Sequence, residues 1–198
     1  MMMVYRSRLF IVLLAAVSFS FAAIAAPRVL EKVPLKWKPT SDLRLGTEQQ
    51  TQAPIQFEVF KDVRERPELV GENREDEDKV KPVTTSDDVG AFVSTHMREL
   101  FKQAGYNVVD SNGRVTIKGE VKQFFVRETS TYKSDVQVHL SVVGPDGATL
   151  WSGIASGDAS RFGRSYVLEN YYEVLSDALV NTVSSMLQSP EFQKALHR

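Results

Sequence analysis

The sequence predicts an α+β fold in which an antiparallel-rich sheet carries two main helices on one face. Its strand-like segments alternate apolar and polar residues, which is typical of antiparallel sheets with one solvated face. Two segments, 86–104 and 168–188, repeat apolar residues at helical spacing. Turn signals join consecutive strands between these helices. The expected element order is therefore β-α-β-β-β-β-α, within a single domain at residues 55–198.

The first strand is predicted from Ile55 to Phe60, where apolar and polar residues alternate. Residues 61–86 turn to charge and proline, include the acidic run 75–78, and show no periodicity. We expect a long exposed loop there. The first helix follows, with Ser86 or Asp87 as its cap and Gly105 as its left-handed end.

Residues 106–159 predict the remaining strands. A short strand at 106–109 and the Asn112-Gly113 turn indicate a hairpin with the strand 114–127. Strands at 132–143 and 148–159 complete an antiparallel meander around a Gly-Pro-Asp-Gly turn. We expect the inner face of strand 114–127 to carry Val115, Ile117, Val121 and Phe125. The second helix spans 168–188, and Ser189-Pro190-Glu191 begins a short final helix.

The N-terminal residues 1–25 have the layout of a signal peptide. Two arginines precede an apolar run from Leu9 to Ala26, and Ala23-Ile24-Ala25 supplies the small residues for cleavage after Ala25. We expect cleavage and a periplasmic location. The alternative is an uncleaved inner-membrane anchor, because the run approaches the length of a spanning helix. Residues 26–54 contain four prolines and predict an extended arm.

The composition excludes several classes of function. Lys plus Arg number 24 against 25 Asp plus Glu, so the net charge is -1 and we expect no nucleic-acid partner. The absence of Cys excludes a disulfide framework, a thiolate zinc site and a Cys nucleophile. His96, His139 and His197 lack ligand spacing. We expect no metal, no cofactor and no catalytic residue.

Blocks along nearly the whole chain after the signal segment occur in the order found in a bacterial envelope family. They are Val33-Pro34-Leu35 in the arm, Glu99 to Tyr106 at the end of the first helix, Leu175 to Leu179, and Ser189-Pro190-Glu191-Phe192. In this order the sequence resembles the YajG-like family of bacterial envelope lipoproteins. The resemblance implies an envelope location and this fold. It does not carry over the lipid anchor, because family members have a lipobox Cys and this sequence has no Cys. We therefore expect a protein that contacts the membrane only through an uncleaved signal segment.

One candidate partner-binding group is polar. Asp62 and Arg64 leave the end of the first predicted strand together. They form either a ligand-facing cluster or a local salt bridge that fixes the exit of the loop. The salt bridge is the structural alternative, and both interpretations remain open at this point.

A second candidate group is aromatic. Because Phe124 and Phe125 are adjacent on a strand, one of them points away from the helix-covered face unless a bulge intervenes. If Phe124, Phe162 and Tyr171 cluster, they form an exposed apolar patch of the kind that marks a partner surface. The alternative is that these side chains pack in the core or beneath the arm.

Together these observations predict a non-enzymatic periplasmic binding or accessory module. Its expected partner is another envelope protein or an amphipathic envelope component. The alternative is an assembly factor for an outer-membrane complex, similar to the lipopolysaccharide-assembly lipoprotein. A hydrolase is the third hypothesis, and it requires a buried carboxylate or His in a cleft.

Overall fold

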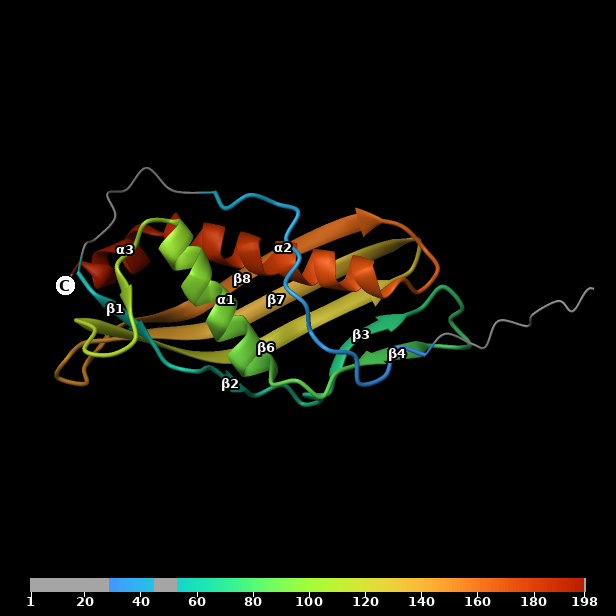
Figure 1. Cartoon of the computed structure of the whole chain (residues 1–198), viewed down its shortest axis with the longest axis horizontal. Helices are drawn as coiled ribbons and strands as arrows, with labels where there is room; N and C mark the ends of the chain where they lie inside the picture. Colours follow the sequence, from blue (N-terminus) through green and yellow to red (C-terminus); the bar gives the residue numbers. More distant parts are fainter. Residues whose placement is uncertain (1–28, 45–52, 198) are drawn as a thin grey trace, which may run out of the picture.

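The computed structural model describes residues 29–44 and 53–197. It confirms the predicted α+β fold: in the described residues, helices pack against one face of an eight-stranded sheet (Figure 1). The helices are α1 (Val89–Gln103), α2 (Leu168–Leu187) and α3 (Pro190–Leu196). The predicted signal peptide, residues 1–25, lies outside the described residues.

The centre of the sheet is the predicted antiparallel meander. It consists of β6 (Val115–Glu128), β7 (Thr131–Val143) and β8 (Thr149–Phe162). Residues of β7 alternate between buried positions that face the helices and partly exposed positions on the opposite face, as a period of two requires. We call this opposite, solvent-facing side of the three strands the outer sheet face.

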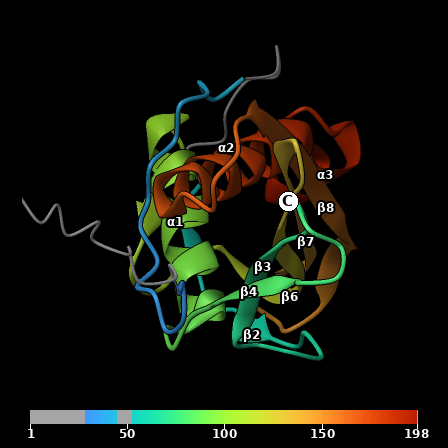
Figure 2. The same cartoon turned by 90° about the vertical axis from the view of Figure 1, so that its right-hand side faces the viewer.

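The other side of β6 is lined in turn by three short parallel strands. These are β1 (Ile55–Phe57), β2 (Lys61–Asp62) and β3 (Leu69–Asn73). β4 (Lys81–Thr84) pairs antiparallel with β3, and β5 (Val108–Val109) pairs parallel with β1. β8 therefore forms one margin of the described sheet, and β4 and β5 lie at the other. Figure 2 shows β8 and β4 on opposite sides of β6 and β7.

Two expectations about the connections were wrong. Residues 61–86 are not one exposed loop, because they contain β2, β3 and β4, held by pairing with β6 and with each other. The expected hairpin around Asn112-Gly113 does not form either. β1 inserts between β5 and β6, and Ile55 N donates to Asn107 O at 2.8 Å while Arg114 N donates to Pro54 O at 2.7 Å.

A bulge in β6 decides which aromatic residue faces the core. The register with β7 shifts between Val121 and Gln123, so Val121 and Phe124 both face the helices. Phe124 is fully buried and packs edge-on against Phe92 of α1, with ring centroids 5.9 Å apart. The expectation that Phe125 lies on the inner face was wrong, because the extra residue reverses the alternation beyond the bulge.

The helices begin and end by recognisable local chemistry. Asp88, one residue later than expected, caps α1 by accepting from Ala91 N at 2.9 Å. Gly105 follows α1 with a φ of 87°, the left-handed conformation that the sequence predicts. Ser189 caps α3, which inserts Phe192 between Phe101 and Trp151. No described helix combines the length and apolarity that a membrane span requires.

The described part of the arm, residues 29–44, crosses from β4 over the helices (Figure 1). Leu30 forms an isolated bridge with Val83 of β4. Further along, the buried carboxylate of Asp177 in α2 accepts from Thr40 N at 2.6 Å and Ser41 N at 2.7 Å. The arm is thus fastened to both the sheet and α2.

Candidate functional site

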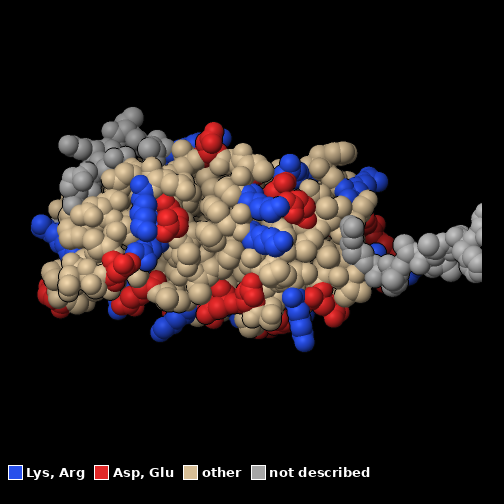
Figure 3. All heavy atoms as spheres, viewed as in Figure 1, with Lys and Arg blue, Asp and Glu red and all other residues tan. Residues whose placement is uncertain are grey.

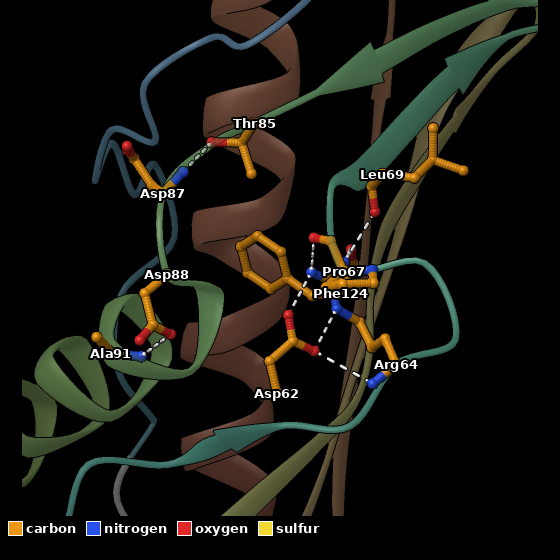
Figure 4. Close-up of polar contacts among 9 residues, drawn as sticks. All are labelled: Asp62, Arg64, Pro67, Leu69, Thr85, Asp87, Asp88, Ala91 and Phe124. Atoms are coloured by element: carbon orange, nitrogen blue, oxygen red, sulfur yellow. Dashed lines mark hydrogen bonds and ion pairs between the residues drawn. The ribbon is translucent and has the colours of Figure 1, made fainter.

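A cleft of about 730 Å³ opens where the β2–β3 segment faces the connection between β4 and α1 (Figure 4). Its wall includes Asp62 from β2, Glu68 before β3, and Thr85, Asp87 and Asp88 before and at the start of α1. Asp62 of the predicted polar group lines this cleft, and Arg64 lines a neighbouring hollow together with Leu69 and Phe124. The contacts of these two residues decide whether they face a ligand.

Arg64 joins the two sides of the β2–β3 segment rather than facing a ligand. Its Nε and Nη2 donate to the two carboxylate oxygens of Asp62 at 2.8 and 2.7 Å. The remaining donors reach the carbonyl oxygens of Leu69, Phe124 and Pro67, the first two at 2.8 and 3.2 Å. All five N–H donors of the guanidinium thus have partners within the protein. With side chains only 7% and 14% exposed, Arg64 and Asp62 form the local salt bridge that was the structural alternative.

The polar groups on the opposite wall are also occupied in fixing the backbone. Thr85 Oγ1 accepts from Asp87 N at 3.1 Å, and an Asp87 carboxylate oxygen accepts from Leu35 N of the arm at 2.8 Å. Asp88 caps α1. The cleft therefore organises the entry into α1 and the position of the arm. Nowhere in the described residues do three or more side chains of His, Cys, Asp or Glu gather as a metal-binding group.

Tyr171, one of the three residues of the predicted aromatic patch, lies in the core. Its hydroxyl donates to Glu128 Oε2 at 2.7 Å, and the other carboxylate oxygen of Glu128 accepts from Tyr166 N at 2.8 Å. Both side chains are buried, and burial together with the adjacent carboxylate raises the pKa of Tyr171. This buried pair holds the segment before α2, where Ser165 and Tyr166 adopt positive φ angles. The contact is structural.

The predicted patch of Phe124, Phe162 and Tyr171 does not form. Phe124 and Tyr171 are buried under the helices, whereas Phe162 is 84% exposed at the end of β8. The bulge in β6 and the helical phase of α2 turn the first two side chains inward. A second exposed apolar side chain on the same strand is one that the sequence did not single out: Ile154, 66% exposed and about 26 Å from Phe162 along β8.

β8 is the feature of the site that sequence reasoning missed. In the described chain it pairs with β7 alone, so its other edge has no strand partner. Its even-numbered residues from Ser152 to Phe162 are exposed and project onto the outer sheet face. The signal for an edge strand was its place as the last strand of the meander, but the alternation alone does not reveal which margin stays unpaired.

The two central histidines differ in their surroundings. His139 lies on the outer sheet face, where its Nε2 is 3.1 Å from Ser152 Oγ. His96 of α1 stacks on Trp37 of the arm, with centroids 4.4 Å apart and an interplanar angle of 8°. Burial lowers the pKa of His96, and nearby Glu99 acts in the opposite direction. His96 thus borders the core and supports the arm.

Charge is distributed evenly over the face that the helices and the arm occupy. Figure 3 shows acidic and basic side chains interspersed on this face, without a broad area of one sign. Some of them pair with each other, as Lys102 of α1 does with Glu99 at 2.9 Å. Such exposed pairs contribute little to stability and mark no binding site.

The comparison with protein families matches residues 46–197 to Lipoprotein_16, whose description is uncharacterized lipoprotein. The chain belongs to this family. The match covers the whole sheet and all three described helices, and it agrees with the bacterial lipoprotein resemblance of the sequence blocks. The envelope location that the sequence implies is consistent with a lipoprotein family. Among curated proteins no match was found.

Solved structures extend the likeness at the level of the fold. A Xanthomonas campestris protein of the DUF330 family superposes with a TM-score of 0.56 at 8% sequence identity, covering 79% of this chain and 95% of that protein. A PelC dodecamer structure from Paraburkholderia phytofirmans gives a TM-score of 0.45 at 14% identity, covering 72% and 92%. At such identities the first likeness shows a shared fold and nothing about activity.

Proposed function

We propose that this protein is a non-enzymatic binding or accessory module of the bacterial periplasm, delivered by the signal segment at residues 1–25. Its proposed partner is another envelope protein, bound at the outer sheet face. One observation carries the proposal: the two largest strongly exposed apolar side chains among the described residues, Ile154 and Phe162, both project from β8 onto the outer sheet face, eight residues apart. Exposed apolar side chains on one uncovered face are typical of a partner surface.

The contacts of the cleft support a binding role over catalysis. Catalysis needs polar groups that are free to meet a substrate, and Arg64, Asp87 and Asp88 are all engaged in holding the backbone. The partner surface is accordingly sought on the sheet, away from the cleft.

The test is affinity capture from crosslinked envelopes of cells that express the full chain with a C-terminal tag. An Ile154→Asp, Phe162→Asp double variant is compared with a Val63→Asp, Val80→Asp double variant, which alters two other exposed apolar side chains away from β8. Circular dichroism checks that both fold. We expect a defined envelope protein with the natural chain and the control, and its loss with the β8 variant. Recovery of the same protein with all three would contradict the proposed surface.

The alternative, an assembly factor for an outer-membrane complex similar to the lipopolysaccharide-assembly lipoprotein, is favoured by the edge of β8 that meets no strand in the described part of the chain. Such an edge accepts an extended segment of another chain. The same capture experiment separates the two, because this alternative predicts an outer-membrane protein among the captured chains. Within the lipoprotein family we propose a YajG-like assignment, on the sequence blocks that carry the resemblance.

A further inference from the structure

We propose that the helix side of the fold carries a recognition groove for an extended, basic, proline-containing segment of another envelope protein. The arm occupies this groove within the chain, and the partner segment displaces residues 35–44. We call the surface of Asp87, α1 and α2 that contacts residues 35–44 the arm groove. It lies on the opposite side of the sheet from the outer sheet face, so the binding that it supports goes beyond the proposed function (Figure 1).

The two halves of the described arm are held in different ways. Leu30 and Val33 are buried, and Val33 N pairs with Thr84 O of β4 at 2.8 Å. Residues 35–44, in contrast, contribute no fully buried side chain, because three of their apolar side chains are half-buried and the other side chains are exposed. Segments with little buried apolar area open at a low cost in free energy. Residues 35–44 can therefore leave the helices while Leu30 and Val33 stay attached to β4.

The arm groove holds residues 35–44 through their backbone. Amides at every third residue donate to its side-chain oxygens: Leu35 to Asp87 at 2.8 Å, Lys38 to Ser176 at 2.9 Å, Ser41 to Asp177 at 2.7 Å and Arg44 to Ser184 at 3.0 Å. Up to the bend at Ser41 this interval is the period of a polyproline II helix, which Pro34 and Pro39 favour. Backbone contacts of this kind accept other extended segments with amides at the same spacing.

The serine acceptors of α2 are oriented by the helix itself. The hydroxyl of Ser176 donates to Tyr172 O at 2.7 Å, and the hydroxyl of Ser184 donates to Val180 O at 2.9 Å. A hydroxyl that donates to the carbonyl four residues before it keeps its lone pairs for a donor outside the helix. These bonds do not involve the arm. The arm groove therefore keeps its acceptors in place when residues 35–44 leave.

One aromatic side chain anchors residues 35–44. Trp37 stacks on His96 with ring centroids 4.4 Å apart and meets Phe92 edge-on at 6.5 Å. Aromatic pairs in these arrangements contribute free energy beyond the area that they bury. The other side chains of this segment are largely exposed, so we expect a partner segment to carry an aromatic residue at the position of Trp37.

Charge complementarity favours a basic segment. The arm groove contributes the acidic side chains of Asp87, Glu169 and Asp177, each bonded to the arm. Residues 35–44 carry three basic side chains and one acidic side chain, and one of the basic ones, Lys38, pairs with Glu169. A basic partner segment meets the same acids, whereas an acidic segment is repelled.

Binding of an arm peptide to the full chain tests the proposal. The probe is a fluorescent peptide with the sequence of residues 33–44, and fluorescence anisotropy measures its Kd. The arm of the chain competes with the peptide, so the apparent Kd is the intrinsic Kd divided by the fraction of open groove. We expect weak binding to the natural chain. Trp37→Ala in the chain weakens the competing arm and leaves the groove intact, so it should tighten binding about tenfold.

Two matched controls define the contacts that the peptide makes. Asp177→Ala, added to the Trp37→Ala chain, removes the acceptor for Thr40 N and Ser41 N and should weaken peptide binding about tenfold. A peptide with Ala in place of its Trp should also bind the Trp37→Ala chain more weakly. Absence of binding to the Trp37→Ala chain overturns the proposal, as does equal binding of the two peptides.

Lys38→Pro keeps the test decisive if Trp37→Ala does not fold. The side chain of Lys38 is exposed, so its replacement leaves the core unchanged. Proline removes the N–H that Ser176 accepts and so weakens the competing arm. We expect tighter peptide binding than to the natural chain. Unchanged peptide binding by a folded Lys38→Pro chain overturns the proposed competition.

Sedimentation over about 1 to 100 µM tests a different occupant, the arm of a second copy. We expect the natural chain and the Trp37→Ala chain to be monomeric. A concentration-dependent dimer that Asp177→Ala abolishes would assign the groove to a second copy and overturn its assignment to another protein. The envelope capture described above concerns substitutions on β8, so the partner surface on the sheet and the arm groove can each fail alone.

Discussion

β6 and β8 are the outer strands of one antiparallel meander. The side of β6 that faces away from β7 is covered by further strands, whereas the corresponding side of β8 is not covered by any described strand. β6 is lined by three short parallel strands, and Phe60 of the β1–β2 connection covers Gly119 so closely that a Cβ there would lie 2.7 Å from its ring. β8 pairs with β7 and, among the described residues, with no further strand. The closed margin is built from buried side chains, and the open margin presents backbone. We expect the margin at β6 to determine the stability of the fold and the margin at β8 to determine binding to other chains.

The largest effect is expected from Phe60→Ala on the closed margin. Phe60 is 3% exposed, and removal of a buried aromatic side chain costs about 3–5 kcal/mol of the free energy of unfolding. Ile154→Ala on the open margin should cost less than about 0.5 kcal/mol, because that side chain is solvated. Urea denaturation measures both. Similar losses for the two variants would remove the distinction between the margins.

Arg64→Ala is expected to cost about 2–4 kcal/mol, because it leaves the largely buried carboxylate of Asp62 and three backbone carbonyls without their donor. Its neighbour Arg66, paired at 3.4 Å with Glu68 on the surface, is the matched control, and Arg66→Ala should change stability by less than about 0.5 kcal/mol. The comparison uses equilibrium unfolding monitored by circular dichroism. A cost below 1 kcal/mol for Arg64→Ala, on the order of a surface pair, would show that the β2–β3 segment is held by its strands alone.

The arm provides a third region to compare with the two margins of the sheet. Its backbone N–H groups donate to side-chain oxygens of α2. Asp177→Ala should cost about 1–2 kcal/mol and should speed amide hydrogen exchange at Thr40 and Ser41, which lose their acceptor. Asp42→Ala, an exposed acid on the same arm, is the control. Unchanged exchange at both amides in the Asp177 variant would mean that other contacts hold this part of the arm.

The smallest effect concerns pH. Because burial lowers the pKa of His96 in the folded state, the unfolded chain binds the proton more readily. Its contribution to stability is therefore complete above the unfolded value of about 6.5 and is lost as the pH falls through the folded pKa. His96→Phe should flatten this part of the stability profile. An unchanged profile in the His96 variant would assign the pH dependence to other groups.

The elements with local signals were predictable, and those made by distant pairing were not. Helical spacing and alternation identify α1, α2 and the meander, because each pattern lies within one segment. β2, β3 and β4 are short, charged strands that exist through pairing over long sequence separation, so their residues read as a loop.

The candidate site was predictable to a similar degree. The contact between Asp62 and Arg64 follows from their spacing in the sequence. The use of all five guanidinium donors of Arg64 does not, because it requires the carbonyl oxygens of Leu69, Phe124 and Pro67 to converge in space. The choice between Phe124 and Phe125 depends on a bulge that leaves no mark in the sequence.

The attachment of the arm to β4 determines how the protein responds to tension. Thr84 N donates to Leu30 O at 2.9 Å and Val33 N donates to Thr84 O at 2.8 Å, beside the buried side chains of Leu30 and Val33. A pull on the chain upstream of Val29 therefore loads these bonds first, at the β3–β4 end of the sheet, remote from α3 (Figure 1). The domain is mechanically held from that end, and the β8 margin bears none of the initial load.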